Sequence, residues 1–162
     1  MKKSIRLIGV SLLLIAIVLN TASCGLIERI FVGSKEERFY NLVCETQELL
    51  DKVADDMYDN WYDCIYNDKF NNDINEAVEE AYDDNDEEIE IIFENTEKIN
   101  ELYKDIKNGK LEDEAKEVMR AYNDYYSLVL EDSGSFNNYS TAKEPARRAL
   151  STALKNYYLE LD

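Results

Sequence analysis

Residues 39–65 read FYNLVCETQELLDKVADDMYDNWYDCI. Apolar residues recur in this stretch at steps of three and four, which places them on one face of an α-helix. The preceding Ser34-Lys-Glu-Glu37 has the form of a capping box, in which serine and glutamate side chains satisfy free backbone N–H groups. We therefore predict a helix that begins after Ser34 and ends near Asn67–Phe70. Its core-facing stripe comprises Phe39, Leu42, Val43, Thr46, Leu49, Leu50, Val53, Met57, Trp61, Cys64 and Ile65.

The same periodicity predicts a second helix over residues 73–108. An Asn or Asp at 71–73 caps its start, and Asn108-Gly109 ends it because glycine readily adopts the left-handed conformation. Asn85 interrupts the apolar stripe, so we expect a kink over 83–88. The rest of the stripe comprises Ile74, Ala77, Val78, Ala81, Ile89, Ile92, Thr96, Ile99, Leu102, Tyr103 and Ile106.

Two shorter helices are predicted in the remainder of the chain. The third starts near Lys110 and is broken at Asp132-Ser-Gly-Ser135. The fourth is expected to start at Thr141-Ala-Lys-Glu144, a second capping-box pattern, where Pro145 fits because proline is tolerated near a helix start. The stripes comprise Leu111, Ala115, Val118, Met119, Tyr122, Tyr125, Tyr126 and Val129 in the third helix, and Ala142, Ala146, Ala149, Leu150, Ala153, Leu154, Tyr157, Tyr158 and Leu161 in the fourth.

These patterns predict an all-α protein, an elongated antiparallel helical bundle of three layers. Only five glycines and one proline occur in 162 residues, which favours long helices over a turn-rich β fold. The first two helices are long and joined by a short turn, so they should pair antiparallel. The last two, laid end to end, would form a third layer broken near 132–140. If the break instead reverses the chain, the result is a four-helix bundle with staggered ends.

A basic and then apolar segment precedes the helices. The first six residues carry three positive charges and no negative one, and Leu7–Leu19 is almost wholly apolar. As a helix this apolar run would be about 20 Å long, shorter than the roughly 30 Å hydrocarbon layer of a membrane. A basic start, a short apolar middle and small residues at the end are typical of an export signal.

The apolar run is followed by Thr21-Ala-Ser-Cys24. This stretch resembles the lipobox of bacterial lipoproteins, in which two small residues precede the modified cysteine; Thr21 stands where leucine is usual. The resemblance implies that the Cys24 thiol carries a diacylglyceryl group and that Cys24 becomes the acylated N-terminus after cleavage. Two or three acyl chains hold a protein on a membrane far more firmly than one chain does.

The resemblance also divides the chain and implies its location. Residues 1–23 would be a signal peptide that is removed, 24–33 a lipidated cysteine with a short tether, and 34–162 an acidic helical-bundle domain. The protein would then be anchored to a bacterial cell membrane through Cys24 and would stand on its extracytoplasmic face, or on the outer membrane in a Gram-negative host.

The processed chain is strongly acidic. It keeps all 35 acidic residues and loses three of the 18 basic ones, so its net charge is about −20. Such a charge repels nucleic-acid phosphates and an anionic membrane surface, so we expect no nucleic-acid ligand and a covalent membrane anchor. A protein partner of this chain is expected to be basic.

Catalytic and cofactor-binding patterns are missing from the sequence. The chain has no histidine, which excludes Ser-His and Cys-His nucleophile pairs and the usual zinc and di-iron helical sites. It also has no glycine-rich phosphate loop. Cys44 and Cys64 lie twenty residues apart on one predicted helix, about 30 Å from each other and beyond disulfide reach. We therefore predict no enzyme activity, no cofactor, and cysteines that serve as small buried hydrophobes.

Residues 73–97 hold twelve acidic residues and no lysine or arginine. Within them, 83–94 resembles an EF-hand loop in its oxygen ligands at positions 1, 3, 5 and 12, but Glu88 occupies the position of the turn glycine. Because the helical stripe continues through this run, we interpret it as a solvated helix face and predict no metal site. Four basic residues in 139–162 suggest that the last helix lies near this acidic one and offsets its charge.

The function expected from these features is a non-catalytic binding or interaction module at the cell envelope, of unknown ligand, with a basic protein or peptide as partner. One alternative is a structural or cation-loaded envelope component, and another is a glycoside hydrolase that uses two carboxylates. Tyrosines could line a protein interface, but most fall on or beside the stripes and are expected in the core or at its edge. These are Tyr82, Tyr103, Tyr122, Tyr125 and Tyr157.

Overall fold

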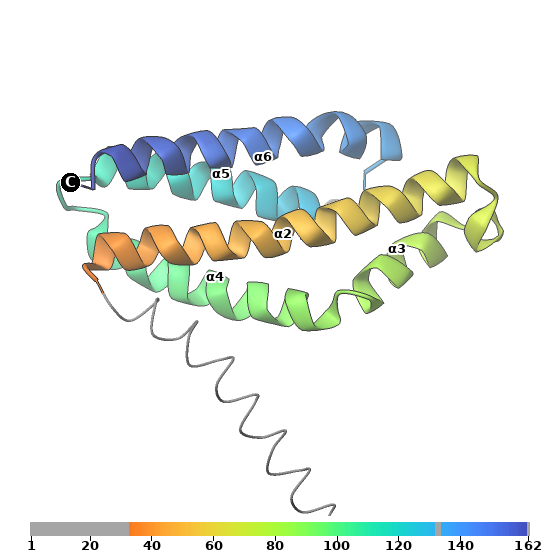
Figure 1. The fold of residues 1–162 in the computed structure, drawn as a ribbon, viewed down its shortest axis with the longest axis horizontal. Helices are drawn as coiled ribbons and strands as arrows, with labels where there is room; N and C mark the ends of the chain where they lie inside the picture. The colour runs from red at the N-terminus through yellow and green to blue at the C-terminus, as the bar shows by residue number, and fades with distance from the viewer. Residues whose placement is uncertain (1–32, 132–133, 162) are drawn as a thin grey trace, which may run out of the picture.

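The computed structural model describes residues 33–131 and 134–161. These residues form five α-helices, α2 to α6, and one short 3₁₀ turn, with no strand among them. The prediction of an all-α helical bundle is confirmed (Figure 1). None of the helices in the described part of the chain is long and apolar enough to cross a membrane.

Helix α2, Lys35–Tyr66, is the longest element and follows the predicted stripe closely. The capping box forms as expected: the Ser34 hydroxyl accepts from the Glu37 N–H at 3.1 Å, and the Glu37 carboxylate accepts from the Ser34 N–H at 2.7 Å. The residues buried on α2 are Phe39, Leu42, Val43, Thr46, Leu50, Val53, Ala54, Met57, Trp61 and Cys64. Because α2 contacts every other helix, this one stripe supplies a large part of the core.

The predicted second helix is two helices, α3 (Ile74–Asp83) and α4 (Asp86–Ile106). The break falls at 84–85, inside the region where a kink was expected. Asn85 is fully buried there, and its side-chain amide donates to the carbonyl oxygen of Ala81 at 2.9 Å. The break therefore has a local cause, because Asn85 replaces a backbone donor at the end of α3.

The turn between α2 and α3 is built from backbone conformations that few residue types favour. The 3₁₀ turn η1, Lys69–Asn72, has positive φ angles at Phe70, Asn71 and Asn72, and Asp68 just before it has one too. Asn and Asp tolerate this left-handed region better than most residues, whereas Phe70 is strained there. Asp73 then caps α3 by accepting from the Asn75 N–H at 2.9 Å, as one of the three predicted caps.

Helix α5, Glu112–Leu130, agrees with the predicted third helix, but the predicted start of the fourth is wrong. Helix α6 spans Phe136–Leu159 and is capped by Ser135, whose hydroxyl accepts from the Asn138 N–H at 3.4 Å. Thr141 is no cap: it lies inside α6, and its hydroxyl donates to the Asn137 carbonyl at 2.8 Å. Pro145 consequently lies well inside the helix rather than at its start.

The preferred three-layer topology is also wrong, and the alternative, a four-helix bundle with staggered ends, is what forms. Helices α5 and α6 pack side by side along their lengths, so the chain reverses between them (Figure 1). The four rods, α2, the broken α3–α4, α5 and α6, alternate in direction. End-to-end stacking would have left the apolar stripes of α5 and α6 without the cover that each gives the other.

The last helix does not neutralise the acidic run. Helix α6 packs along α2 and α5, whereas α3 and α4 lie diagonally across the bundle from it. The charges in the sequence favour a contact between α6 and α4. These two helices run in the same direction, however, and neighbouring rods in this bundle run in opposite directions. Instead, α2 supplies cations to α4, with Lys52 paired to Glu88 and Lys35 paired to Asp105 at 2.7 Å.

The core divides into two clusters. The larger fills most of the bundle, and the smaller, at the η1 end, is formed by Met57, Trp61, Ala81 and Tyr139. The start of α2 and the C-terminal end of the chain both lie at the opposite end, next to the turn between α4 and α5 (Figure 1). We call the end that holds the start of α2 and the end of α6 the terminal end, and the end that holds η1 the distal end.

Candidate functional site

An apolar pocket of about 340 Å³ opens at the distal end, between α2, α3 and the neighbouring parts of α5 and α6. Helix α3 packs against α2 mainly through two alanines, Ala77 and Ala81, which bring the backbones close but fill little volume. The space beside them remains open. The side chains lining it are Met57, Trp61, Ile74, Asn75, Val78, Glu79, Tyr82, Val129 and Tyr139.

Trp61 and Tyr139 give the pocket a rigid aromatic wall. Their rings meet edge to face at 5.4 Å between centroids, and both side chains are more than nine-tenths buried. The Tyr139 hydroxyl donates to the Ala54 carbonyl at 3.1 Å, which holds α6 against α2. The Trp61 indole N–H has no acceptor among the described residues.

Both pocket tyrosines hold their hydroxyl protons more firmly than a free tyrosine does. Burial raises the pKa of both the Tyr82 and the Tyr139 hydroxyl. Tyr82 reaches the Val129 carbonyl at 3.4 Å, so the phenol of each residue serves as a hydrogen-bond donor that joins two helices. Among the described lining residues, Glu79 is the one acidic side chain, and none is a lysine or arginine.

An aromatic ridge on α2 adjoins the pocket. Tyr58, Tyr62 and Tyr66 are spaced by four residues, with ring centroids 6.2 Å apart for the first pair and 4.8 Å for the second. Phe136 at the start of α6 touches the ridge at Tyr58 and Tyr66, and it also packs edge to face on Trp61. Tyr62 and Tyr66 are 43% and 60% exposed, so the ridge continues the apolar character of the pocket onto the surface.

One lysine lies against the ridge, and it is already engaged. The Lys143 ammonium pairs with Asp55 at 2.6 Å and lies 4.6 Å from the centre of the Tyr58 ring. Its side chain is only 16% exposed. Lys143 therefore serves to join α6 to α2 and adds little positive charge to the outer surface.

Charge is divided unequally between the two ends of the molecule. We divide the bundle at the level of two hydrogen-bonded pairs, Gln47 with Ser151 and Thr96 with Tyr122. Together these four residues come from all four rods. On the terminal side of this level the described residues include eleven acids and nine bases, whereas on the distal side they include 21 acids and five bases. The net formal charges are therefore −2 and −16.

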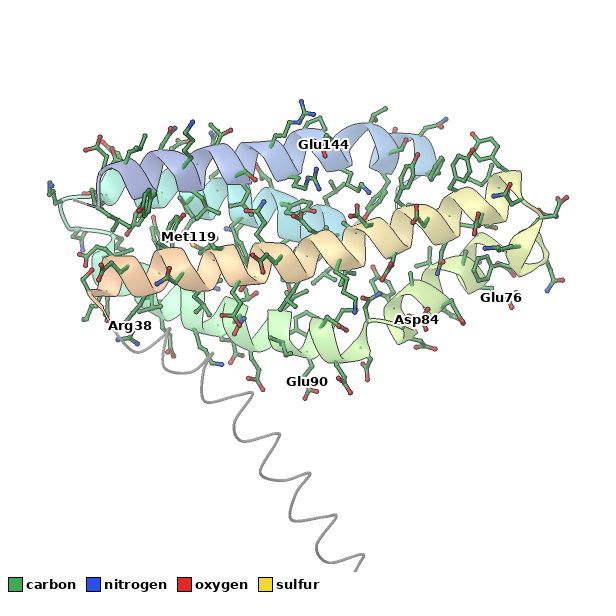
Figure 2. All side chains as sticks on the ribbon, viewed as in Figure 1. Arg38, Glu76, Asp84, Glu90, Met119 and Glu144 are labelled. Atoms are coloured by element: carbon green, nitrogen blue, oxygen red, sulfur yellow. The ribbon has the colours of Figure 1, made fainter. Side chains whose placement is uncertain are left out.

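The acidic residues of 73–94 lie in the distal half. Asp84 and Glu90 point away from the bundle along α3 and α4, while Arg38 lies at the terminal end (Figure 2). The stretch that resembled an EF-hand loop is helical on both sides of the break at 84–85. Its carboxylates therefore spread around two helices, and no three acidic or cysteine side chains among the described residues are arranged to hold a metal ion.

The remaining sequence predictions fall into three groups. Cys24, the predicted lipid attachment site, lies outside the described residues, as do the signal segment and nearly all of the tether. Cys44 and Cys64 are both free and lie on α2, half-buried and buried respectively. The five tyrosines expected in the core or at its edge are all buried or half-buried.

The pocket and the ridge were not predicted from the sequence. The spacing of Tyr58, Tyr62 and Tyr66 was a usable signal, because residues four apart share a helix face and this face lies beside the core stripe. The pocket itself had no such signal, because it depends on how α6 and α3 meet α2. Comparison with known proteins adds no further assignment: no protein-family model, curated protein or solved structure matches this chain.

Proposed function

We propose that this protein is a non-catalytic binding module, held by a lipid at Cys24 on the extracytoplasmic face of a bacterial membrane, whose ligand is a basic protein or peptide. The observation that supports the proposal is the division of charge, with −16 on the distal side of the bundle and −2 on the terminal side. A lipid-anchored protein with this polarity presents its acidic end away from the bilayer.

The position of the start of α2 agrees with such an orientation. The start of α2 lies at the terminal end (Figure 1), and eight residues separate Gly33, just before this helix, from Cys24, a span of at most about 30 Å. The nearly neutral end would then face the membrane, where a strongly acidic surface would be repelled by anionic lipid headgroups. The acidic end would be free to attract cationic partners by long-range electrostatic steering.

The anchor is tested separately from the ligand. We expect metabolic labelling with a palmitate analogue to mark the full-length protein and detergent to release it from membranes. Cys24→Ser should abolish the label. An unlabelled wild-type protein would overturn the anchoring half of the proposal.

The ligand class is tested by charge variants of the full-length protein purified in detergent. Glu80, Asp83 and Glu90 are exposed residues of the distal half, and none of them pairs with a lysine or arginine in the described part of the chain. We expect their joint replacement by Gln, Asn and Gln to weaken capture of basic envelope proteins, and we expect capture by the wild type to fall steeply as salt rises from about 0.05 to about 0.5 M.

The matched control replaces three exposed acids of the terminal half, Glu97, Glu101 and Glu160, by Gln. This variant has the same net charge as the distal one. A difference in capture between the two variants would therefore be due to the position of the acids and not to the total charge. Equal loss in both variants, or capture that does not respond to salt, would count against the distal half as the ligand surface. A melting temperature raised by Mg²⁺ more than by Na⁺ of equal ionic strength, with no protein captured, would favour the structural, cation-loaded alternative.

A further inference from the structure

We infer that the distal pocket takes a bulky apolar side chain from a basic segment of the partner protein, while lysine or arginine residues on either side of it meet the surrounding carboxylates. This inference rests on the proposed function, because it assigns to the basic ligand a docking point and a sequence character. It predicts a segment in which one aromatic or large aliphatic residue is flanked by cations.

The pocket is suited to a side chain rather than to a large cofactor. Its volume of about 340 Å³ lies at the low end of the roughly 300–1,000 Å³ found for small-molecule sites. Trp61 and Tyr139 are held by contacts with the rest of the bundle, so the wall against which an aromatic guest would stack is ordered before binding. Such preorganised apolar pockets are where a single anchor residue contributes most to an interface.

Charge complementarity selects the occupant. No described lysine or arginine lines the pocket, Glu79 is part of the lining, and the same helix also carries Glu76, Glu80 and Asp83. Figure 2 shows Glu76 on α3 at this end of the molecule. A neutral apolar molecule would fill the cavity but would leave these carboxylates without a counterion. An anionic molecule would be repelled by them.

The ridge formed by Tyr58, Tyr62 and Tyr66 gives the segment a second contact. It runs beside the pocket and is exposed at its outer part. Tyrosine rings can cover the aliphatic stems of lysine and arginine and can hold their cationic heads over the ring face. The Lys143 ammonium over Tyr58 shows that this contact already occurs within the chain.

The test uses Trp61, the one tryptophan of the chain, as a reporter inside the pocket. The probes are a lysine-rich peptide with a single central phenylalanine and a matched peptide in which alanine replaces it. With the full-length protein in detergent, we expect the phenylalanine peptide to bind about tenfold more tightly and to change the Trp61 emission, and the alanine peptide to bind without that change.

The pocket variant is Val78→Phe, which fills the cavity without altering charge, and its matched control is Ile91→Phe, on the exposed face of α4 outside the pocket. We expect Val78→Phe to reduce binding of the phenylalanine peptide to that of the alanine peptide, and Ile91→Phe to change nothing. Ile74→Ala is a second pocket variant, since Ile74 is 45% exposed and its truncation should leave the fold intact. It should weaken the same peptide severalfold.

The outcomes separate this inference from the proposed function. If both peptides bind with the same salt dependence and affinity, and the pocket variants have no effect, the pocket assignment is wrong while the basic ligand class stands. If neither peptide binds at low salt, the proposed function fails. Binding of a neutral apolar dye such as Nile red in the pocket, unaffected by salt and not displaced by the phenylalanine peptide, would overturn the choice of occupant.

Discussion

Asn85 is fully buried where α3 gives way to α4, and its side-chain amide donates to two acceptors. One is the Ala81 carbonyl and the other is the Asp56 carboxylate on α2, each at 2.9 Å. The same residue therefore ends one helix and ties the broken rod to the central helix. A single polar side chain thus determines where the longest acidic segment bends.

Asn85→Asp should destabilise the protein strongly near neutral pH, because it places a second carboxylate beside Asp56 in a buried site. The expected loss is about 3 kcal/mol in the free energy of unfolding at pH 7. The loss should shrink in acid, where the new carboxyl is protonated. Urea denaturation at pH 4 and pH 7 measures both values.

The control for that substitution is Asn85→Ala, which removes both hydrogen bonds without adding a charge. It should cost about 1–2 kcal/mol, with little dependence on pH. If the aspartate and alanine variants lost the same stability at both pH values, the buried contact with Asp56 would not be the cause.

Asp51 is a half-buried carboxyl whose ionisation opposes folding. Burial raises its pKa above the ordinary value of 3.8, although the Tyr125 hydroxyl, which donates to it at 2.6 Å, and Arg147 act in the other direction. Because the folded pKa lies above the unfolded one, Asp51 favours the folded state most at low pH. That advantage is lost as the pH rises through the folded pKa.

Asp51→Asn should therefore become more stable relative to the wild type as the pH rises from about 3 to about 7. The amide oxygen of asparagine can still accept from Tyr125, so the hydrogen bond is kept while the ionisation is removed. The measurement is the difference in unfolding free energy across this pH series. A difference that stays constant, or that falls with rising pH, would contradict the assigned direction of the shift.

At the scale of elements, α6 shows how tertiary contacts can extend a helix beyond its local signals. Its first turns include Asn137, Asn138 and Ser140, which are weak helix formers. Tyr139, however, is buried against Trp61 and donates to a carbonyl of α2, which holds these turns in helical form. Because the helix starts early, Pro145 lies in its interior and destabilises it there, since proline has no N–H to donate to the carbonyl four residues earlier.

Pro145→Ala should stabilise the protein. The substitution restores the missing N–H at an exposed position, and the gain in helix formation exceeds the added entropy of the unfolded chain. We expect about 1–2 kcal/mol and a melting temperature higher by several degrees, measured by circular dichroism. Ala149→Gly, at another exposed position of α6, is the opposite control and should lower the melting temperature.

At the scale of the whole molecule, acidic residues concentrate in one half of an elongated bundle. Many of them have like-charged neighbours three or four positions away on the same helix, and few have cationic partners such as the one that Lys52 gives Glu88. The distal half therefore stores electrostatic repulsion. Such a charge arrangement is unfavourable for the isolated protein, and the cationic ligand that we propose would relieve it.

The distal variant with Glu80, Asp83 and Glu90 replaced by Gln, Asn and Gln should accordingly unfold at a higher temperature than the wild type in low salt. The expected gain is about 1 kcal/mol, because each of the three has an acidic neighbour four positions away. The terminal variant of equal charge should gain less. Thermal melts at about 0.02 and about 0.5 M NaCl provide the check, since salt should remove most of the difference.

The sequence by itself determined the helical class, the capping of α2, the break near Asn85 and the acidity of the central segment. These follow from side-chain periodicity and local hydrogen bonding, which act within a few residues along the chain. The tertiary structure decided the reversal between α5 and α6, the early start of α6, the diagonal separation of α6 from α4, and the pocket beside Trp61. Each of these depends on which apolar faces meet, and that choice is made by packing between segments far apart in the sequence, where local pattern carries no information.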